Sequence, residues 1–237
     1  MKPAPFEYVA ARSVEEALEA LSVEGARVLA GGQSLVPLLN LRAVRATRLV
    51  DINAAGLGVI RRRDGALELG ATVRQAALER SRLIAAHWPL LAQAVAHVGH
   101  VATRSRGTVG GSVVHADPRA QLPAALAALD ARFAFEGPLL VSIAVPPLPA
   151  GARTAYAEYA RTRGVFAEAG AAVVVARGHA RVALLGTGRA TRAEAALLSG
   201  ASAAEAAELA AEAVEGDHRR ALVADVTRRA LTAAGRR

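Results

Sequence analysis

The chain contains no cysteine. This absence excludes a disulfide framework, a thiolate nucleophile, a cysteine zinc site and an iron–sulfur cluster held by the chain itself. Redox chemistry would therefore require a group that the protein binds. The 237 residues still provide enough chain to bury a core, as one large domain or two small ones.

Lysine and aromatic residues are scarce. Lys2 is the only lysine, and Phe, Trp and Tyr make up 3% of the chain. With no second lysine the P-loop pattern GxxxxGK[ST] is excluded, and GxGxxG is also absent. The net charge of +8 favours nucleic-acid binding, but few rings are present to stack on bases, and the one dense basic run is Arg61–Arg63. We therefore expect no nucleic-acid partner.

Long hydrophobic runs are also missing. No apolar stretch approaches the roughly 18 residues of a membrane span, and the N-terminal residues 1–7 lack the apolar region of a secretory signal. The sequence predicts a cytoplasmic protein without a membrane span.

Short apolar runs alternate with amphipathic stretches, which is typical of a mixed α+β protein. Ser13, with Glu16 three residues later, fits a capping box at the start of a helix. The run Arg27–Ala30 predicts a strand that leads directly into two glycines, and Ser34 is placed to cap a short helix through Leu41. Further strands are expected at Arg48–Ile52, at Val59–Ile60 paired with Leu67–Leu69, and at Leu139–Val145. Helices are expected at Val73–Leu78 after Thr72, at Leu90–Val98 and at Leu122–Leu129.

The proline-rich stretch Pro146–Pro149 is the expected domain boundary. Beyond it, a small α+β domain should contain a three-stranded antiparallel sheet formed by Ala155–Ala160, Ala171–Ala176 and Ala180–Leu185. Helices should follow at residues 192–198, 203–214 and 219–233, while Gly186-Thr187-Gly188 is expected to form a strand-to-loop turn.

Two glycine-rich segments carry the functional argument. The first segment is Ala30-Gly31-Gly32-Gln33-Ser34-Leu35 and the second segment is Thr108-Val109-Gly110-Gly111-Ser112. Paired glycines allow consecutive main-chain N–H groups to face one concavity, and without Cβ atoms a phosphate can approach closely. Either segment alone is more simply an ordinary turn. Two of them suit a ligand that carries two phosphates.

Other candidates are weaker. Arg104 and Arg106 precede the second segment, where they would face a phosphate or a reduced cofactor, or else be solvated surface arginines. His97 and His100 lack an evident third metal ligand. His115 either lies near a cofactor or caps a surface helix, and Trp88 is expected in the core or in an interface. The sequence also lacks GxSxG.

These motifs resemble a known family. The run from Ala30 to Leu39, the segment Gly107–Ser112 and the tetrapeptide His115-Ala116-Asp117-Pro118 are similar to those of the FAD-binding medium subunits of molybdenum hydroxylases, the carbon monoxide dehydrogenase and xanthine dehydrogenase family. The resemblance covers most of the chain, including residues 6–8, 49–52 and 192–200. It implies a two-part FAD-binding domain of the vanillyl-alcohol-oxidase (PCMH) type at residues 1–149, with a subdomain at about 1–55. A smaller domain would occupy residues 150–237.

The resemblance also implies the cofactor, its site and the partners. Both segments would wrap the FAD pyrophosphate, Asp117 and the residue at the position of Gln121 would contact the flavin nucleotide, and Leu140 would pack near the isoalloxazine ring. The chain would transfer electrons from an iron–sulfur (2Fe-2S) subunit, fed by a molybdopterin subunit, to NAD, a quinone or oxygen. No catalytic residue and no metal ligand of its own is implied.

The chain departs from this family in three places. Gln121 replaces an acid, Ala157 and Glu158 stand where a basic residue is expected, and the segment between Asp130 and Leu139 is short, with Phe133 and Phe135 making the connection directly. These departures leave a second hypothesis open, in which the chain is a degenerate assembly subunit with weak or no FAD binding.

Overall fold

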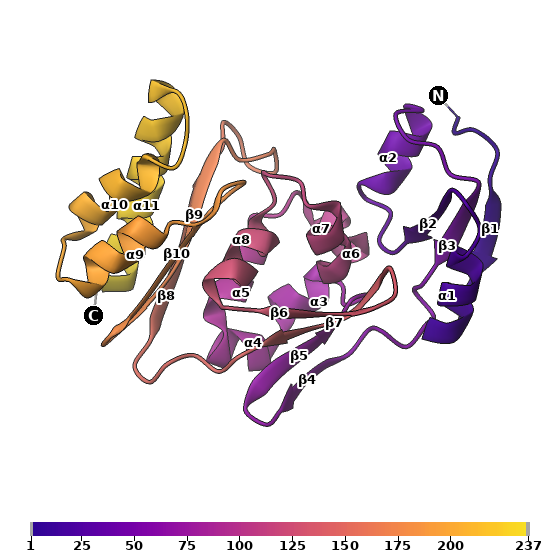
Figure 1. The fold of residues 1–237 in the computed structure, drawn as a ribbon, viewed down its shortest axis with the longest axis horizontal. Helices are drawn as coiled ribbons and strands as arrows, with labels where there is room; N and C mark the ends of the chain where they lie inside the picture. The colour runs from indigo at the N-terminus through magenta and orange to yellow at the C-terminus, as the bar shows by residue number, and fades with distance from the viewer. Residues whose placement is uncertain (1, 236–237) are drawn as a thin grey trace. The chain divides into compact units, whose positions relative to one another are not determined.

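The computed structural model describes residues 2–235, which divide into two compact units (Figure 1). Unit 1 is drawn from Met1–Ala77, Val101–His115 and Arg132–Ala144, and unit 2 from Leu78–His100, Ala116–Ala131 and Val145–Arg237. Neither unit is one stretch of sequence, because the chain passes between them five times. The expected boundary after residue 149 and the subdomain at about 1–55 stay predictions, and residues 1, 236 and 237 of the expected domains lie outside the described residues.

Unit 1 begins with a parallel three-stranded sheet in the order β1-β3-β2, made of β1 (Glu7–Ala10), β2 (Ala26–Leu29) and β3 (Arg48–Asp51). Parallel neighbours need crossover connections, which here contain the helices α1 (Val14–Leu21) and α2 (Leu35–Asn40). The carboxyl ends of parallel strands meet at one edge of a sheet. Gly31, which follows β2, and Asp51, which ends β3, are therefore brought to the same edge.

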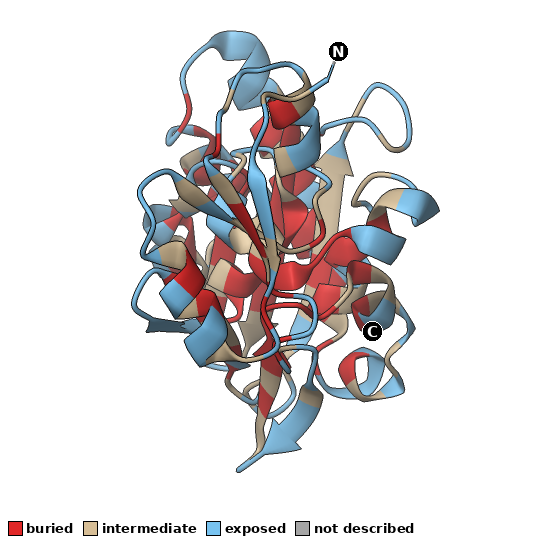
Figure 2. Cartoon of the chain, turned by 90° about the vertical axis from the view of Figure 1, so that its right-hand side faces the viewer, coloured by how far each residue is buried: buried red, intermediate tan, exposed pale blue. Residues whose placement is uncertain are grey.

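Helix α1 covers this sheet. Ala17 and Ala20 pack with Val50 and Ile52 in one buried cluster, and Figure 2 colours the buried residues of the chain red. Ser13 accepts from the Glu16 N–H at 3.2 Å as expected, but the Glu16 carboxylate accepts from the Arg12 N–H instead of the Ser13 N–H. The expected capping box is thus half formed, because the carboxylate reaches the preceding residue.

Unit 1 also contains most of a four-stranded sheet in the order β4-β5-β7-β6. Its strands are β4 (Ile60–Arg63), β5 (Ala66–Gly70), β6 (Arg132–Glu136) and β7 (Leu139–Val145). The connection between Asp130 and Leu139 is as direct as the sequence predicts, since β6 runs into β7 through Gly137 and Pro138. Sequence reasoning did not identify this connection as a strand.

The second glycine segment is helical. Helices α6 (Val101–Arg106) and α7 (Val109–His115) flank Gly107 and Thr108, so the alternative that the whole segment is an ordinary turn is wrong. Helix α3 (Gln75–Arg80) starts later than expected after Thr72, because Arg74 forms a β-bridge with Thr108 and keeps this stretch extended.

Unit 2 contains an antiparallel sheet in the order β11-β10-β9-β8, formed by β8 (Arg153–Tyr159), β9 (Ala169–Ala176), β10 (His179–Leu184) and β11 (Gly188–Arg189). The three expected strands are present. The sheet nevertheless has four strands instead of three, because the chain turns back after Gly186 and pairs Gly188 and Arg189 with β10.

Helices cover both sides of this sheet (Figure 1). On one side lie α9 (Thr191–Leu198), α10 (Ala203–Ala211) and α11 (Asp217–Gly235), whose apolar residues form one core with β8, β9 and β10. On the other lie α5 (Pro89–Val95) and α8 (Gln121–Ala128), with α4 (Arg82–His87) beside α5. Trp88, which was expected either in the core or in an interface, is buried here. Its indole N–H donates to the Pro146 carbonyl at 2.8 Å. Within residues 2–235 no helix is both long and apolar enough to cross a lipid bilayer.

Candidate functional site

The two glycine segments meet backbone to backbone within unit 1. A Cβ atom placed on Gly31 would collide with the Arg106 carbonyl oxygen and would lie 2.8 Å from Gly107 Cα. Real Cβ atoms do not approach backbone so closely, so only glycine fits at position 31. Gly32 follows with φ +73°, a conformation that side chains disfavour. Both glycines of the first segment are therefore required by the local structure.

The first segment has unpaired main-chain donors. Among residues 2–235, no protein acceptor meets the main-chain N–H of Gly31, Gly32, Gln33 or Ser34. Ser34 was expected to cap α2, but its side chain makes no capping hydrogen bond, because its backbone is already helical (φ −103°, ψ −46°). Four consecutive N–H groups and the Ser34 hydroxyl are thus available to a ligand.

The second segment differs, because its main-chain N–H groups have acceptors within the protein. The N–H groups of Val109 and Gly110 donate to the carbonyls of Val73 and Ala71 at 2.9 and 3.0 Å. Those of Gly111 and Ser112 donate to the Thr108 hydroxyl and carbonyl at 3.0 and 3.2 Å. Every N–H from Val109 to Ser112 is thus satisfied by the protein. Gly111 and Ser112 keep partial exposure, whereas Thr108, Val109 and Gly110 are buried.

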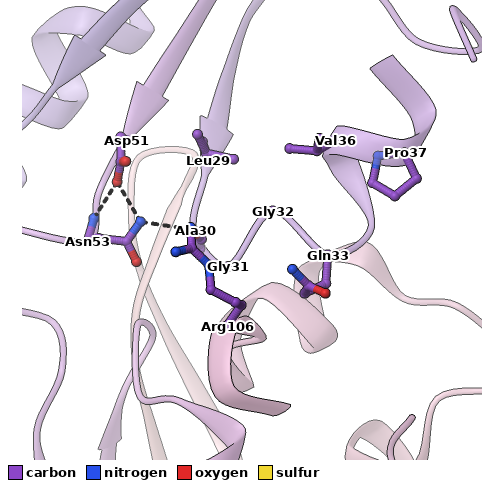
Figure 3. A pocket seen from close by; sticks show the side chains of 10 residues that line it. All are labelled: Leu29, Ala30, Gly31, Gly32, Gln33, Val36, Pro37, Asp51, Asn53 and Arg106. Carbon is purple, nitrogen blue, oxygen red and sulfur yellow. Dashed lines mark hydrogen bonds between the residues drawn. The ribbon is translucent and has the colours of Figure 1, made fainter. Parts of the chain in front are cut away.

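A pocket of about 330 Å³ opens beside the first segment (Figure 3). It combines the glycine backbone, apolar side chains and polar groups from the ends of β3 and α6, and its lining consists of Leu29, Ala30, Gly31, Gly32, Gln33, Val36, Pro37, Asp51, Asn53 and Arg106. Its size and mixed lining are typical of small-molecule and cofactor sites. Of the two arginines expected near a cofactor, the exposed Arg106 extends along the first segment, while Arg104 is buried.

A hydrogen-bond network that sequence reasoning missed supports this pocket. The Asn53 side-chain amide donates to the Ala30 carbonyl at 2.8 Å and to the Asp51 carboxylate at 2.6 Å. Arg74 donates to Asn53 Oδ1 at 2.7 Å and also to the Arg106 carbonyl. The network thus joins the ends of β2, β3 and α6. The sequence did contain a signal for this network. Asp51 and Asn53 stand at the end of a predicted strand, and if that strand is parallel to the one before Gly31, both strands end at the same edge of the sheet.

Asp51 is held in its charged form. Burial tends to raise the pKa of its carboxyl group, but hydrogen bonds from the Asn53 main-chain N–H, the Tyr8 hydroxyl and the Asn53 side chain, together with the positive charge of Arg74, lower the pKa overall. A carboxylate on the lining can accept hydrogen bonds from hydroxyl groups of a ligand.

The lowered pKa predicts a pH-dependent contribution to stability. Since the folded pKa lies below the unfolded value of about 3.9, ionised Asp51 stabilises the fold above that pH, and the contribution is lost as the pH falls through the folded pKa. We expect Asp51→Asn to lower the free energy of unfolding by about 1 kcal/mol at pH 7, and by progressively less in acid. Urea unfolding of both proteins between pH 7 and pH 3 measures this.

Asp64→Asn is the matched control, because Asp64 is exposed in a turn at φ +50°, which asparagine also tolerates. A difference between Asp51→Asn and the parent chain that stays constant down to pH 3 would contradict the assignment of a stabilising carboxylate.

The remaining predicted site residues have other surroundings. In unit 2, Asp117 accepts hydrogen bonds from the Arg119 main chain and guanidinium, at 2.8 to 3.1 Å, and the same guanidinium lies 3.8 Å from the centre of the Phe166 ring. Leu140 is buried in β7, opposite Phe135. Leu35 begins α2. Whether any of the predicted site residues contacts FAD stays a prediction.

Gln121 belongs to a buried network around Glu158 in unit 2. The Glu158 carboxylate accepts from Gln121 Nε2 at 3.1 Å and from the Tyr156 hydroxyl at 2.8 Å, and it lies 3.1 Å from His97 Nδ1. Burial tends to raise the pKa of Glu158, but the hydrogen bonds from His97, Gln121 and Tyr156 lower it overall. The two departures at positions 121 and 158 are therefore one structural unit, in which the neutral amide supports the carboxylate.

The histidines form no metal centre in the described part of the chain, where no group of three or more candidate ligands occurs. His97 pairs with Glu158, and His115 is exposed in the last turn of α7.

In this α+β fold, free main-chain N–H groups at a pair of glycines border a pocket. This combination defines a class of protein that binds phosphate-bearing ligands. The comparisons with known proteins agree with this class and refine it. Residues 4–139 match the family described as the FAD binding domain in molybdopterin dehydrogenase. The chain therefore belongs to the family of FAD-binding medium subunits of molybdenum hydroxylases. It is an oxidoreductase subunit, and its cofactor is FAD.

Individual relatives cover most or all of the chain. It is 41% identical to the 6-hydroxypseudooxynicotine dehydrogenase complex subunit alpha of Paenarthrobacter nicotinovorans, over 79% of this chain and 75% of the relative. It is 32% identical to the carbon monoxide dehydrogenase medium chain of Hydrogenophaga pseudoflava, over 99% and 98%. That alignment extends over 282 positions, so the relative contains segments that the 237 residues here lack.

Solved structures share the fold. Carbon monoxide dehydrogenase from Hydrogenophaga pseudoflava, in a form that lacks the Mo-pyranopterin moiety of the molybdenum cofactor, superimposes with a TM-score of 0.91 at 34% identity, covering 99% of both chains. Quinoline 2-oxidoreductase from Pseudomonas putida 86 gives a TM-score of 0.89 at 32% identity, covering 99% of this chain and 98% of the other.

Proposed function

We propose that the main-chain N–H groups of the first segment bind the pyrophosphate of FAD. The observation that carries this proposal is that the N–H groups of Gly31, Gly32, Gln33 and Ser34 have no acceptor among the described residues and border a pocket. Unpaired backbone donors in a polar concavity favour an anion with several acceptor oxygens. The residues present thus fit a diphosphate, and Arg106 adds a positive charge on the lining.

In this proposal the main role of the second segment is to position the backbone of the first segment. Thr108 fixes the first turn of α7 through its hydroxyl, and Gly107 allows the backbone of the first segment to approach. An ideal Cβ on Gly111 would lie 3.9 Å from Ala30 Cβ, so the partly exposed Gly111 and Ser112 adjoin the first segment. The Ser112 hydroxyl is then a further donor for the same ligand.

We further propose that the chain transfers electrons within a multi-subunit molybdenum hydroxylase. Bound FAD supplies the redox chemistry, whereas this chain binds and orients it and contains no cysteine for a cluster of its own. The electrons would come from an iron–sulfur subunit fed by a molybdopterin subunit, and NAD, a quinone or oxygen would accept them. Relatives named as subunits of dehydrogenase complexes support this assignment.

Titration of the full chain with FAD tests the binding step. We expect one FAD per chain, with quenched flavin fluorescence and a structured visible absorption band. A chain that leaves the flavin spectrum unchanged while still associating with iron–sulfur and molybdopterin subunits would contradict the proposal and support the assembly subunit instead.

A further inference from the structure

Strand β6 is an edge strand with an apolar, unpaired side. In the sheet order β4-β5-β7-β6, its only strand neighbour within the described residues is β7 (Figure 1). All five of its residues are exposed, and Phe133 and Phe135 are 44% and 54% accessible. An exposed edge of this kind offers free main-chain donors and acceptors to another strand.

The side chains of β6 divide between the two faces of the sheet. Phe133 pairs with the buried Ile143, and Phe135 pairs with the buried Leu140, so both rings extend the buried face beyond its rim. Because side chains alternate along a strand, Arg132, Ala134 and Glu136 belong to the opposite face. Neither Arg132 nor Glu136 forms an ion pair within residues 2–235.

The sequence of β6, Arg132-Phe133-Ala134-Phe135-Glu136, is complementary to itself when reversed. We propose that β6 pairs antiparallel with β6 of a second copy of this chain, centred on Ala134. In that register each Arg132 lies opposite Glu136 of the other copy, and each Phe133 lies opposite the other Phe135. One face then gains two ion pairs beside two alanines, and the other gains two aromatic pairs, as a two-fold interface requires.

The other edge of the same sheet, formed by β4, is less suited to pairing with a second copy. Strand β4 carries Arg61, Arg62 and Arg63 in succession, so a second copy would meet like charges there. The register shift between β6 and β7 does not interrupt the β6 edge. Ala134 pairs with Ser142 and Phe135 with Leu140, which places the extra residue, Val141, on β7. The outer side of β6 therefore remains a regular strand for pairing.

Sedimentation equilibrium of the full chain tests the interface. We expect a concentration-dependent dimer, weakened about ten-fold or more by either Arg132→Glu or Glu136→Arg, because each places like charges opposite at both ends. Mixing these two variants should restore the dimer, since every charge then meets its opposite. Arg62→Glu, which reverses a charge on the other edge, should leave dimerisation unchanged.

The register has a separate test, because the chain lacks cysteine. Oxidised Ala134→Cys should form a covalent dimer, since antiparallel partners lie within disulfide reach, whereas Arg62→Cys should not. A chain that stays monomeric at all concentrations would overturn the proposal. So would a dimer insensitive to Arg132→Glu, or a mixture of the two charge variants that fails to associate. Far-UV circular dichroism confirms that each exposed variant is folded.

Discussion

Replacing Gly31 by alanine should weaken FAD binding about 10- to 100-fold. The added Cβ would meet the Arg106 carbonyl and Gly107 Cα, and both atoms belong to backbone that cannot move aside cheaply. Forcing extra volume into such a contact costs about 1–3 kcal/mol, and it separates the two segments that form the pocket. Fluorescence titration with FAD measures the loss.

Gly235→Ala is the matched control. Gly235 has open space around it, so the same added methyl group should leave FAD affinity unchanged. An unaltered affinity for Gly31→Ala, in a protein that is still folded at the temperature of the titration, would mean that the first segment does not hold the cofactor.

Arg74→Met should lower the free energy of unfolding of the FAD-free chain by about 2–3 kcal/mol, because hydrogen bonds to charged groups are strong and their loss leaves acceptors unpaired. The substitution removes the donors to the Arg106 carbonyl and to Asn53 Oδ1. Asn53 in turn holds the Ala30 carbonyl, so FAD affinity should fall about ten-fold as well. Urea unfolding and FAD titration measure the two effects.

Arg74→Lys separates charge from geometry, since lysine keeps the charge but lacks the planar fork that reaches two acceptors. We expect it to recover only part of the loss. Arg62→Met on the exposed edge strand β4 should change neither quantity. Wild-type stability and affinity in Arg74→Met would show that the network does not support the pocket.

The first segment was predictable because its signals are local. An apolar strand, two glycines and a short helix follow one another within 15 residues, and the structure places β2, Gly31, Gly32 and α2 in that order. The three main strands of the sheet in unit 2 were predictable for the same reason. Each is an apolar run bounded by glycine or charged residues, which indicates a strand without reference to the rest of the chain.

The second segment was not predictable because its structure depends on distant residues. Three glycines between residues 107 and 111 favour a loop by propensity. Pairing with residues 71–75 instead fixes Gly107 and Thr108, and the Thr108 hydroxyl caps the helix that follows. The Glu158 network has the same origin, since Tyr156 and Glu158 belong to β8, whereas Gln121 and His97 lie 37 and 61 positions before Glu158.

A crystal structure of the full chain with bound FAD tests the central claim most directly. We predict pyrophosphate oxygens within about 3 Å of the main-chain nitrogen atoms of Gly31, Gly32, Gln33 and Ser34, the ordinary hydrogen-bond distance. A pyrophosphate bound elsewhere, with those four nitrogen atoms hydrogen-bonded only to water, would contradict it.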